Sequence, residues 1–441
     1  MSGNELAQVE AEIRSRGVEW EAELSLDRIS ALLDLLGDPQ KTYQVVHIAG
    51  TNGKSSTARM IDALLRARNL RTGRFTSPEL SSMRERISVD GEPLSAERFV
   101  EVYRDVAPYA EMVDARGVKV SFFELLTAMG YAAFADAPVD VAVVETGMGG
   151  AYDATNVADG RIAVVTPIAL DHTEHLGADV RTIAGEKAGI IKPGSTAVLA
   201  QQPLPAAEVL MRRAAETGAT VAREGLEFGV LHRELAVGGQ LLRLQGLKGV
   251  YEEIMLPLYG AHQASNAACA LAAVEALTGG SDPLDEELVR QAFAEVTSPG
   301  RLEVVRRGPT IVVDSAHNPA GMQASLDALE EAFAFTRVIG VVAMMADKDV
   351  SGMLDLLEPI LEEVVVTQNS SPRSMGSAEL AGIAREIFGE ERVHEAKRFD
   401  DAIDLAVALA DQGDEFGTGV LITGSVTTAG DARVLLKADR R

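Results

Sequence analysis

A turn with two glycines, HIAGTNGKSST at residues 47–57, constrains the fold of this chain more than any other segment. It follows an apolar run that suits a buried strand and precedes a stretch with helical spacing. In that setting backbone N–H groups can approach phosphate oxygens, and the helix dipole favours the anion. Lys54 would bring positive charge to the outer phosphates. The standard spacing G-x-x-x-x-G-K-[ST] is not met because Ile48 replaces its first glycine, so a simple strand-to-helix turn is the competing interpretation.

Short apolar runs alternate with helical stretches over most of the 441 residues. This alternation predicts an α/β protein: a P-loop-type ATPase domain with a mostly parallel sheet, then a smaller C-terminal Rossmann-like α/β domain. The breaker Thr-Ser-Pro-Gly at residues 297–300 predicts domains 1–297 and 298–441. Residues 226–257 alternate in hydrophobicity and predict a β-hairpin appended to the first domain. The predicted strands are residues 45–49, 139–145, 162–168, 196–200, 310–314, 338–345, 364–367 and 419–423, and the predicted helices include 54–66, 122–134 and 264–277.

The charge balance narrows the range of partners. Lys and Arg number 41 against 66 Asp and Glu, and the net charge of −25 speaks against nucleic acid and anionic membranes, because both need a basic surface. The single cysteine, Cys269, excludes an intrachain disulfide and a CxxC metal site. The chain has no run of about 18 apolar residues, and its polar N-terminus lacks the apolar core of a signal peptide. We therefore expect a cytoplasmic protein without a membrane span.

A series of short motifs follows the glycine turn in a fixed order. The motifs are TSP at 76–78, ERI at 85–87, FFE at 122–124, VETGMGG at 144–150, DATN at 153–156, LDHT at 170–173, EKAGI at 186–190, HQ at 262–263 with Asn266, GRLE at 300–303, DSAHNP at 314–319 and DKD at 347–349. With the turn, this series resembles the folylpolyglutamate synthase and dihydrofolate synthase family, a branch of the Mur ligase superfamily, over residues 40–435. The resemblance implies a Mur ligase-type ATP-binding central domain at 1–297 and a glutamate ligase domain at 298–441.

The resemblance also implies an activity. An ATP-dependent, ADP-forming acid–amino-acid ligase of this family would phosphorylate an acceptor carboxylate, and the amine of L-glutamate would then displace the phosphate. The expected acceptor is dihydropteroate or a tetrahydrofolate-type molecule, and the expected cofactors are ATP and one or two Mg²⁺ ions. Lys187 resembles the lysine that is carbamylated in many Mur-type ligases. We expect a monomer, as is common in this family.

The motifs assign residues to each part of such a site. For the metal they imply Ser77, Glu145 and His172. Glu145 is also favoured by its position, since a carboxylate at the end of a parallel strand lies where open α/β sheets bind ligands. The nucleotide would contact Thr51, Asn52, Gly53, Lys54, Ser55 and Ser56 of the turn, and Asn266, Arg301 and Asp314; catalysis would use Lys54, Lys187 and His317; the substrates would contact Asp153 and Ser425.

Simpler alternatives exist for several of these residues. Ser77 could start a turn before a proline, His317 could belong to a helix cap, and Ser425 could lie in a turn. Two positions also depart from the family's usual form: Glu79 stands where His is common, and Ala151 where Arg is common. Both departures remove positive charge near the expected acceptor. Two further hypotheses therefore stay open: an amide ligase of the same machinery that acts on a non-folate carboxylate, and a nucleotide-dependent binding or switch protein.

Overall fold

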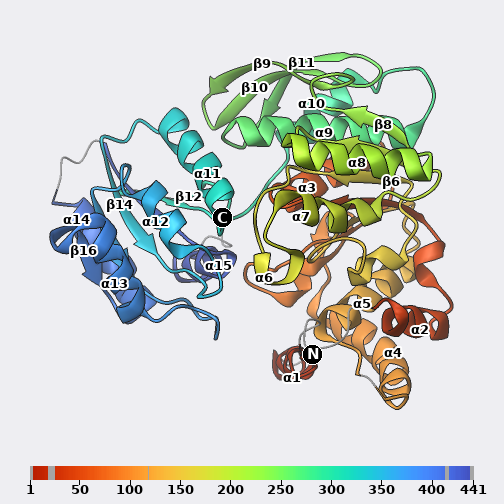
Figure 1. Cartoon of the computed structure of the whole chain (residues 1–441), viewed down its shortest axis with the longest axis horizontal. Helices are drawn as coiled ribbons and strands as arrows, with labels where there is room; N and C mark the ends of the chain where they lie inside the picture. The colour runs from red at the N-terminus through yellow and green to blue at the C-terminus, as the bar shows by residue number, and fades with distance from the viewer. Residues whose placement is uncertain (1–2, 18–24, 118, 413–416, 438–441) are drawn as a thin grey trace.

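The computed structural model describes residues 3–17, 25–117, 119–412 and 417–437. It confirms the predicted fold class, with two α/β domains that lie side by side (Figure 1). In the second domain, α11 (Pro319–Ala332) and α15 (Val426–Leu435) lie on the side that faces the first domain. None of the helices in the described residues has the length and apolar character needed to cross a membrane.

The first domain is built on one eight-stranded sheet. Its strands are β1 (Gln44–Ala49), β2 (Thr72–Phe75), β3 (Ile87–Val89), β4 (Glu92–Pro93), β5 (Val141–Glu145), β6 (Ile162–Val165), β7 (Thr196–Leu199) and β8 (Thr220–Arg223). Their order is β4-β3-β2-β5-β1-β6-β7-β8, and all pairs are parallel except those of β3 with β2 and β4. The central strands are buried almost throughout, because helices cover both faces, and this is why the sequence shows them as continuous apolar runs.

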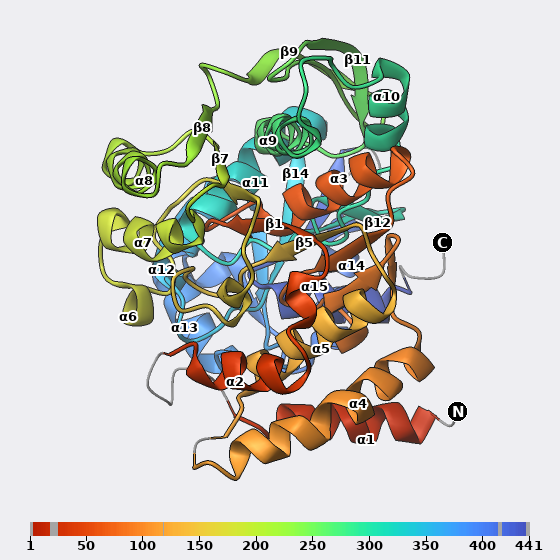
Figure 2. The same cartoon turned by 90° about the vertical axis from the view of Figure 1, so that its right-hand side faces the viewer.

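Helices pack on both faces of this sheet. The described helices of the first domain are α1 (Gly3–Arg14), α2 (Asp27–Leu35), α3 (Lys54–Ala67), α4 (Ala96–Asp114), α5 (Phe122–Asp136), α6 (Thr173–Leu176), α7 (Val180–Lys187), α8 (Leu204–Thr217), α9 (Ala261–Thr278) and α10 (Glu286–Ala294). On one face α3, α9 and α10 form a core with the strands, and on the other face α1, α2, α4 and α5 form a second core. A third core holds α7 and α8 against β6 and β7. Figure 2 shows α1 and α4 side by side at one end of the domain.

The predicted β-hairpin is part of a three-stranded antiparallel sheet. It consists of β9 (Gly229–Ala236), β10 (Gly239–Gln245) and β11 (Val250–Leu256), in the order β11-β10-β9. The turn between β9 and β10 contains Gly238 with φ of 83°, a conformation that glycine adopts easily. The inward side chains of this sheet join the core around α9, so the sheet is an appendage of the first domain, as predicted.

The second domain has a six-stranded sheet of order β12-β13-β17-β14-β15-β16. Its strands are β12 (Glu303–Arg307), β13 (Thr310–Val313), β14 (Arg337–Val342), β15 (Glu363–Val366), β16 (Val393–Glu395) and β17 (Thr418–Thr423), and the helices besides α11 and α15 are α12 (Val350–Leu357), α13 (Ser377–Phe388) and α14 (Phe399–Ala410). Only β12 runs antiparallel to its neighbour. The four predicted strands are confirmed, whereas the two edge strands β12 and β16 were not predicted. The domain boundary predicted at residues 297–298 falls between α10 and β12.

Candidate active site

The glycine turn connects β1 to α3, in the setting that the sequence predicts. Gly53 precedes the first residue of α3 and has φ of 88°, which favours glycine. A Cβ atom added at Gly53 would lie 2.5 Å from Oδ1 of Asn266, and one added at Gly50 would lie 1.8 Å from Oγ1 of Thr166. Both glycines are therefore needed for close approach of the turn to its neighbours.

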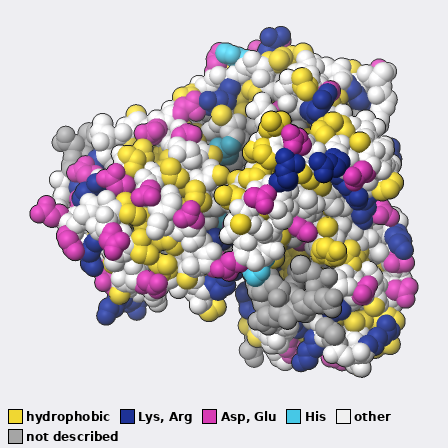
Figure 3. Space-filling model, viewed as in Figure 1, with side chains coloured by type: hydrophobic (Ala, Val, Ile, Leu, Met, Phe, Trp, Pro, Cys, Tyr) yellow, Lys and Arg dark blue, Asp and Glu magenta, His cyan; other side chains and the backbone are white. Residues whose placement is uncertain are grey.

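A pocket lies where the two domains meet, at the carboxyl ends of β1 and β5. Its lining comes from both domains, and Lys54 within it donates a hydrogen bond to the carbonyl of Thr51 at 3.1 Å. Figure 3 shows histidine side chains along the junction of the two domains. The first domain contributes Gly50, Thr51, Asn52, Gly53, Lys54, Ser55, Ser77, Pro78, Glu145, Gly147, Met148, Gly149, Asp171, His172, Leu176 and Lys187, and the second contributes Arg301, His317 and Val426.

Glu145 ends β5 at the wall of this pocket and is only 1% exposed. The hydroxyl of Ser55 contacts both carboxylate oxygens, at 2.9 and 2.8 Å, and the backbone N–H of Ser77 donates to one of them at 3.3 Å. Burial raises the pKa of Glu145, although the charge of Lys54 and the hydrogen bond from Ser55 act in the opposite direction. A second cation at this carboxylate would relieve the cost of burying its charge.

The donors around Glu145 suit a hard cation. In the part of the chain that the structure describes, no group of three or more His, Cys, Asp and Glu side chains is arranged to hold a metal. Such groups mark zinc sites, whereas Mg²⁺ keeps several waters and needs one or two carboxylates. Glu145, Ser55 and Ser77 provide oxygen donors at the pocket, and burial lowers the pKa of His172 to about 3, which leaves a neutral imidazole. These residues therefore fit a magnesium ion.

Lys187 ends α7 and is almost completely buried at the pocket, with 4% of the residue exposed. Its Nζ donates a hydrogen bond to the carbonyl of Gly50, at 2.8 Å, so it contacts the glycine turn directly. Burial, and secondly the charge of Lys54, lower the pKa of Lys187 to about 7. A lysine in this state has a large neutral fraction near neutral pH, which makes its amine nucleophilic.

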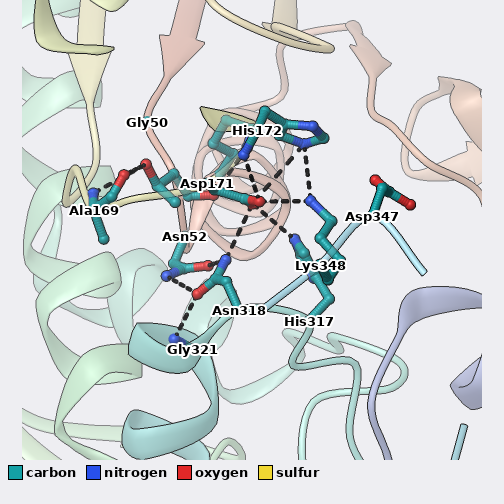
Figure 4. A network of polar contacts seen from close by, with 12 residues as sticks. Gly50, Asn52, Ala169, Asp171, His172, His317, Asn318, Gly321, Asp347 and Lys348 are labelled. Carbon is teal, nitrogen blue, oxygen red and sulfur yellow. Dashed lines mark hydrogen bonds and ion pairs between the residues drawn. The ribbon is translucent and has the colours of Figure 1, made fainter. Parts of the chain in front are cut away.

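Asp171 lies at the centre of a cluster of polar side chains from both domains (Figure 4). The other members of this Asp171 cluster are His172, His317, Asn318 and Lys348. Burial raises the pKa of the Asp171 carboxyl, but the hydrogen bond with His317 and the charges of His317 and Lys348 outweigh burial and hold this pKa well below its ordinary value. Asp171, Asn318 and Lys348 were not among the predicted site residues. Their signal was their place in the motifs LDHT, DSAHNP and DKD.

Several predicted site residues lie behind the pocket wall, and their roles stay predictions. Asp314 accepts hydrogen bonds from backbone N–H groups of Leu302 and Ala316, and Asp153 accepts from Met148, which lines the pocket. The remaining three are Asn266, which lies against Gly53 and donates to Gln263; Ser56, which contacts Ser298; and Ser425, which precedes α15 and contacts Asn369 and Thr428.

The charge of Glu79 is compensated. Arg86 lies 2.5 Å from its carboxylate and Arg14 of α1 lies at 3.4 Å, while the Arg86 guanidinium stacks over the ring of Phe122. Burial raises the pKa of Glu79, but Arg86 outweighs this and the pKa is lowered overall. The two arginines therefore offset the negative charge that Glu79 brings to this position.

Comparisons with known proteins place both domains of the chain in one family. Residues 120–274 match the family model of the Mur ligase middle domain, and residues 300–426 match that of the Mur ligase glutamate ligase domain. The dihydrofolate synthase/folylpolyglutamate synthase of Mycobacterium tuberculosis is 51% identical, over 98% of this chain and 94% of that protein. The folylpolyglutamate synthase of Lacticaseibacillus casei is 35% identical, over 93% of this chain and 94% of that protein.

Two solved structures superpose along the full length. Mycobacterium tuberculosis folylpolyglutamate synthase complexed with ADP gives a TM-score of 0.95 at 51% identity and covers 98% of both chains. Escherichia coli FolC in complex with DHPP and ADP gives a TM-score of 0.86 at 28% identity and covers 99% of this chain and 98% of that one. The similarity therefore includes both domains and the junction between them.

Proposed function

This chain belongs to the dihydrofolate synthase/folylpolyglutamate synthase family of Mur ligases, and on that premise we propose how its pocket joins L-glutamate to a folate-type carboxylate. The reaction class is that of an ATP-dependent, ADP-forming amide ligase. The observation that carries the mechanism is the pocket itself, where a phosphate-binding turn, two lysines and a buried carboxylate of one domain face Arg301 and His317 of the other. We propose that the chain acts as a monomer, as its resemblance to the family implies.

The glycine turn is proposed to hold the phosphates of ATP. The N–H groups at the start of α3 and the charge of Lys54 favour the phosphate oxygens, and Arg301 can add a bidentate contact from the second domain. Phosphoryl transfer needs mostly positioning and neutralisation of charge. The γ-phosphoryl group moves from ATP to the acceptor carboxylate, which gives ADP and an acyl phosphate. The amine of L-glutamate then attacks the acyl carbon, phosphate leaves, and the amine loses a proton as the amide forms.

A magnesium ion is proposed to be held by Glu145, with Ser77 and His172 as the other residues at its site. When bound, it would supply positive charge to the phosphate oxygens and act as a Lewis acid. In this structure the Ser55 hydroxyl is within hydrogen-bond distance of both carboxylate oxygens of Glu145, and one of these oxygens would become free to bind the metal ion. Closure of the two domains around the substrates would exclude water, which would otherwise hydrolyse the acyl phosphate.

A folate-type acceptor is supported by the similarity to the dihydrofolate synthase/folylpolyglutamate synthase of Mycobacterium tuberculosis over nearly the full length of both proteins. Glu79 does not argue against such an anionic acceptor, because Arg14 and Arg86 offset its carboxylate. We propose that dihydropteroate, a tetrahydrofolate or both are accepted.

Phosphate release tests this function. Purified protein with ATP, Mg²⁺ and L-glutamate is compared with dihydropteroate, with a tetrahydrofolate and without acceptor. We expect release that depends on a pterin acceptor and on glutamate, with a product heavier by one glutamyl residue. Folded protein that binds ADP but shows no pterin-dependent release would contradict the proposal and favour a non-folate carboxylate. Release that needs neither acceptor nor glutamate would favour a nucleotide switch.

Replacing Gly53 by Ala tests the glycine turn. The added methyl group would collide with the Asn266 side chain and would have to adopt a left-handed φ, which costs a non-glycine residue about 1–2 kcal/mol. We expect ADP affinity, measured by titration calorimetry, to fall about tenfold or more, which corresponds to about 1.4 kcal/mol. Gly37→Ala is the matched control, because Gly37 has φ of 79° with open space around it. Equal ADP affinities of the two variants would argue against the predicted role of the turn.

A further inference from the structure

Asp171 of the first domain contacts two separate segments of the second. Lys348 Nζ lies 2.5 Å from one of its carboxylate oxygens, while Asn318 Nδ2 and His317 Nε2 lie 3.2 and 3.4 Å from the other (Figure 4). Asn318 caps the N-terminus of α11, whereas Lys348 stands in the turn before α12. The side chains of Asp171 and Lys348 are 6% and 8% exposed, so solvent screens their attraction little.

The same contacts extend to groups that line the pocket. Asn318 exchanges two hydrogen bonds with Asn52 of the glycine turn, at 3.1 and 3.0 Å. Lys348 Nζ lies 3.4 Å from Nε2 of His172. Because His172, His317 and Asn52 all line the pocket, a shift of the Asp171 carboxylate would change the lining on both sides of the domain junction.

A second ion pair joins the domains away from the pocket. Arg233 of β9 contacts Glu331 of α11 through two hydrogen bonds, at 2.8 and 2.5 Å. Their side chains are 22% and 34% exposed, and neither residue lines the pocket. This pair offers a control that separates general attachment of the domains from alignment of the pocket.

We propose that Asp171 is a positioning residue for ligation, whose carboxylate holds Lys348 and His317 of the second domain at the pocket of the first. The inference rests on the proposed function. In that reaction the nucleotide, acceptor and amine must meet in one pocket built by two domains. A misplacement of about 1 Å can slow such a reaction by about 100-fold, even when every reacting group is present. Asp171 acts here through its neighbours and need not touch a substrate.

The test uses three variants: Asp171→Asn, Lys348→Met and the double variant that combines these two substitutions. Glu331→Gln is the control. We expect Asp171→Asn to lower kcat by about 10- to 100-fold through misalignment. ADP affinity should change by less than about threefold, since a group that acts on the chemical step alters kcat more than binding. The double variant should be no slower than the slower single variant, because both substitutions break one contact. Glu331→Gln should keep the wild-type kcat.

Hydrogen–deuterium exchange supplies a readout that does not depend on turnover. Exchange of the backbone at residues 316–322 should increase in Asp171→Asn and in Lys348→Met, and stay as in the wild type in Glu331→Gln. If Asp171→Asn does not fold, Lys348→Met tests the same contact with Asp171 in place. Unchanged exchange, a kcat within twofold of the wild type, multiplicative effects in the double variant, or an equal loss in Glu331→Gln would each overturn the inference. Absence of ligation by the wild type would instead count against the proposed function.

Discussion

Replacing Lys54 by methionine is expected to lower kcat by about 100- to 1000-fold, the loss that follows removal of one donor aimed at charge developing in a transition state. The Lys54 side chain lines the pocket beside the glycine turn, and its Nζ is held 3.1 Å from the Thr51 carbonyl before any phosphate is bound. Methionine keeps most of the side-chain length but carries no charge. The substitution therefore removes an electrostatic interaction, the one that stabilises the charge on the phosphoryl group during its transfer.

Steady-state phosphate release with saturating ATP, acceptor and L-glutamate measures this effect. Lys41→Met is a suitable control, because Lys41 is exposed and its ion pair with Asp38 lies on the surface. The melting temperature of Lys54→Met should match that of the wild type, since Lys54 makes one hydrogen bond and no ion pair among the described residues. A kcat within a few-fold of the wild type would show that Lys54 does not act on the transferred phosphoryl group.

Much of the fold could be predicted from the sequence because burial leaves a local pattern. Strands β1, β5, β6 and β7 are covered on both faces, so each gives an apolar run. Edge strands lack that pattern. One of the three residues of β16 is buried, and one of the five residues of β12 is buried. Neither strand therefore gives a recognisable apolar run in the sequence.

The residues of the candidate site also fall into two groups, those that the local sequence indicated and those that only the structure brings together. Lys54 stands in a turn before a helix and Glu145 at the end of a strand, whereas Lys187 was indicated only by the resemblance of its motif; the structure brings all three to one pocket. The Asp171 cluster depends on contacts across 147 and 177 positions of the chain, from Asp171 to Asn318 and to Lys348. Spacing within one sequence carries no information about which distant segments meet, so only the structure could show this cluster.

Ligation activity is expected to depend on CO2 through Lys187. A carbamate forms when the neutral amine attacks CO2, and it converts the side chain from a cation into an anion with oxygen donors. The pKa of about 7 places the change from charged to neutral amine near neutral pH. Below that pKa the amine is mostly protonated and unreactive, and above it the amine is mostly neutral. Protein that has been freed of CO2 by incubation at pH 6 should therefore ligate slowly. Bicarbonate should restore its activity far better at pH 8 than at pH 6.

Two variants make this dependence specific to Lys187. Lys187→Ala should lose about 100-fold or more in kcat, as does loss of a preorganised charged group at a reacting centre, and bicarbonate should not restore it. Short carboxylic acids such as acetate should restore part of it, because they can supply oxygen donors in the space that the side chain leaves. Lys192→Ala is the matched control: burial also lowers the pKa of Lys192, but this lysine contacts the carbonyls of Asn156 and Ala158 and does not line the pocket. Two outcomes would contradict this prediction: loss of the bicarbonate response in Lys192→Ala but not in Lys187→Ala, or equal wild-type activity with and without CO2 at pH 8. Lys187 would then act as an unmodified amine, and its hydrogen bond to Gly50 would only stabilise the conformation of the glycine turn.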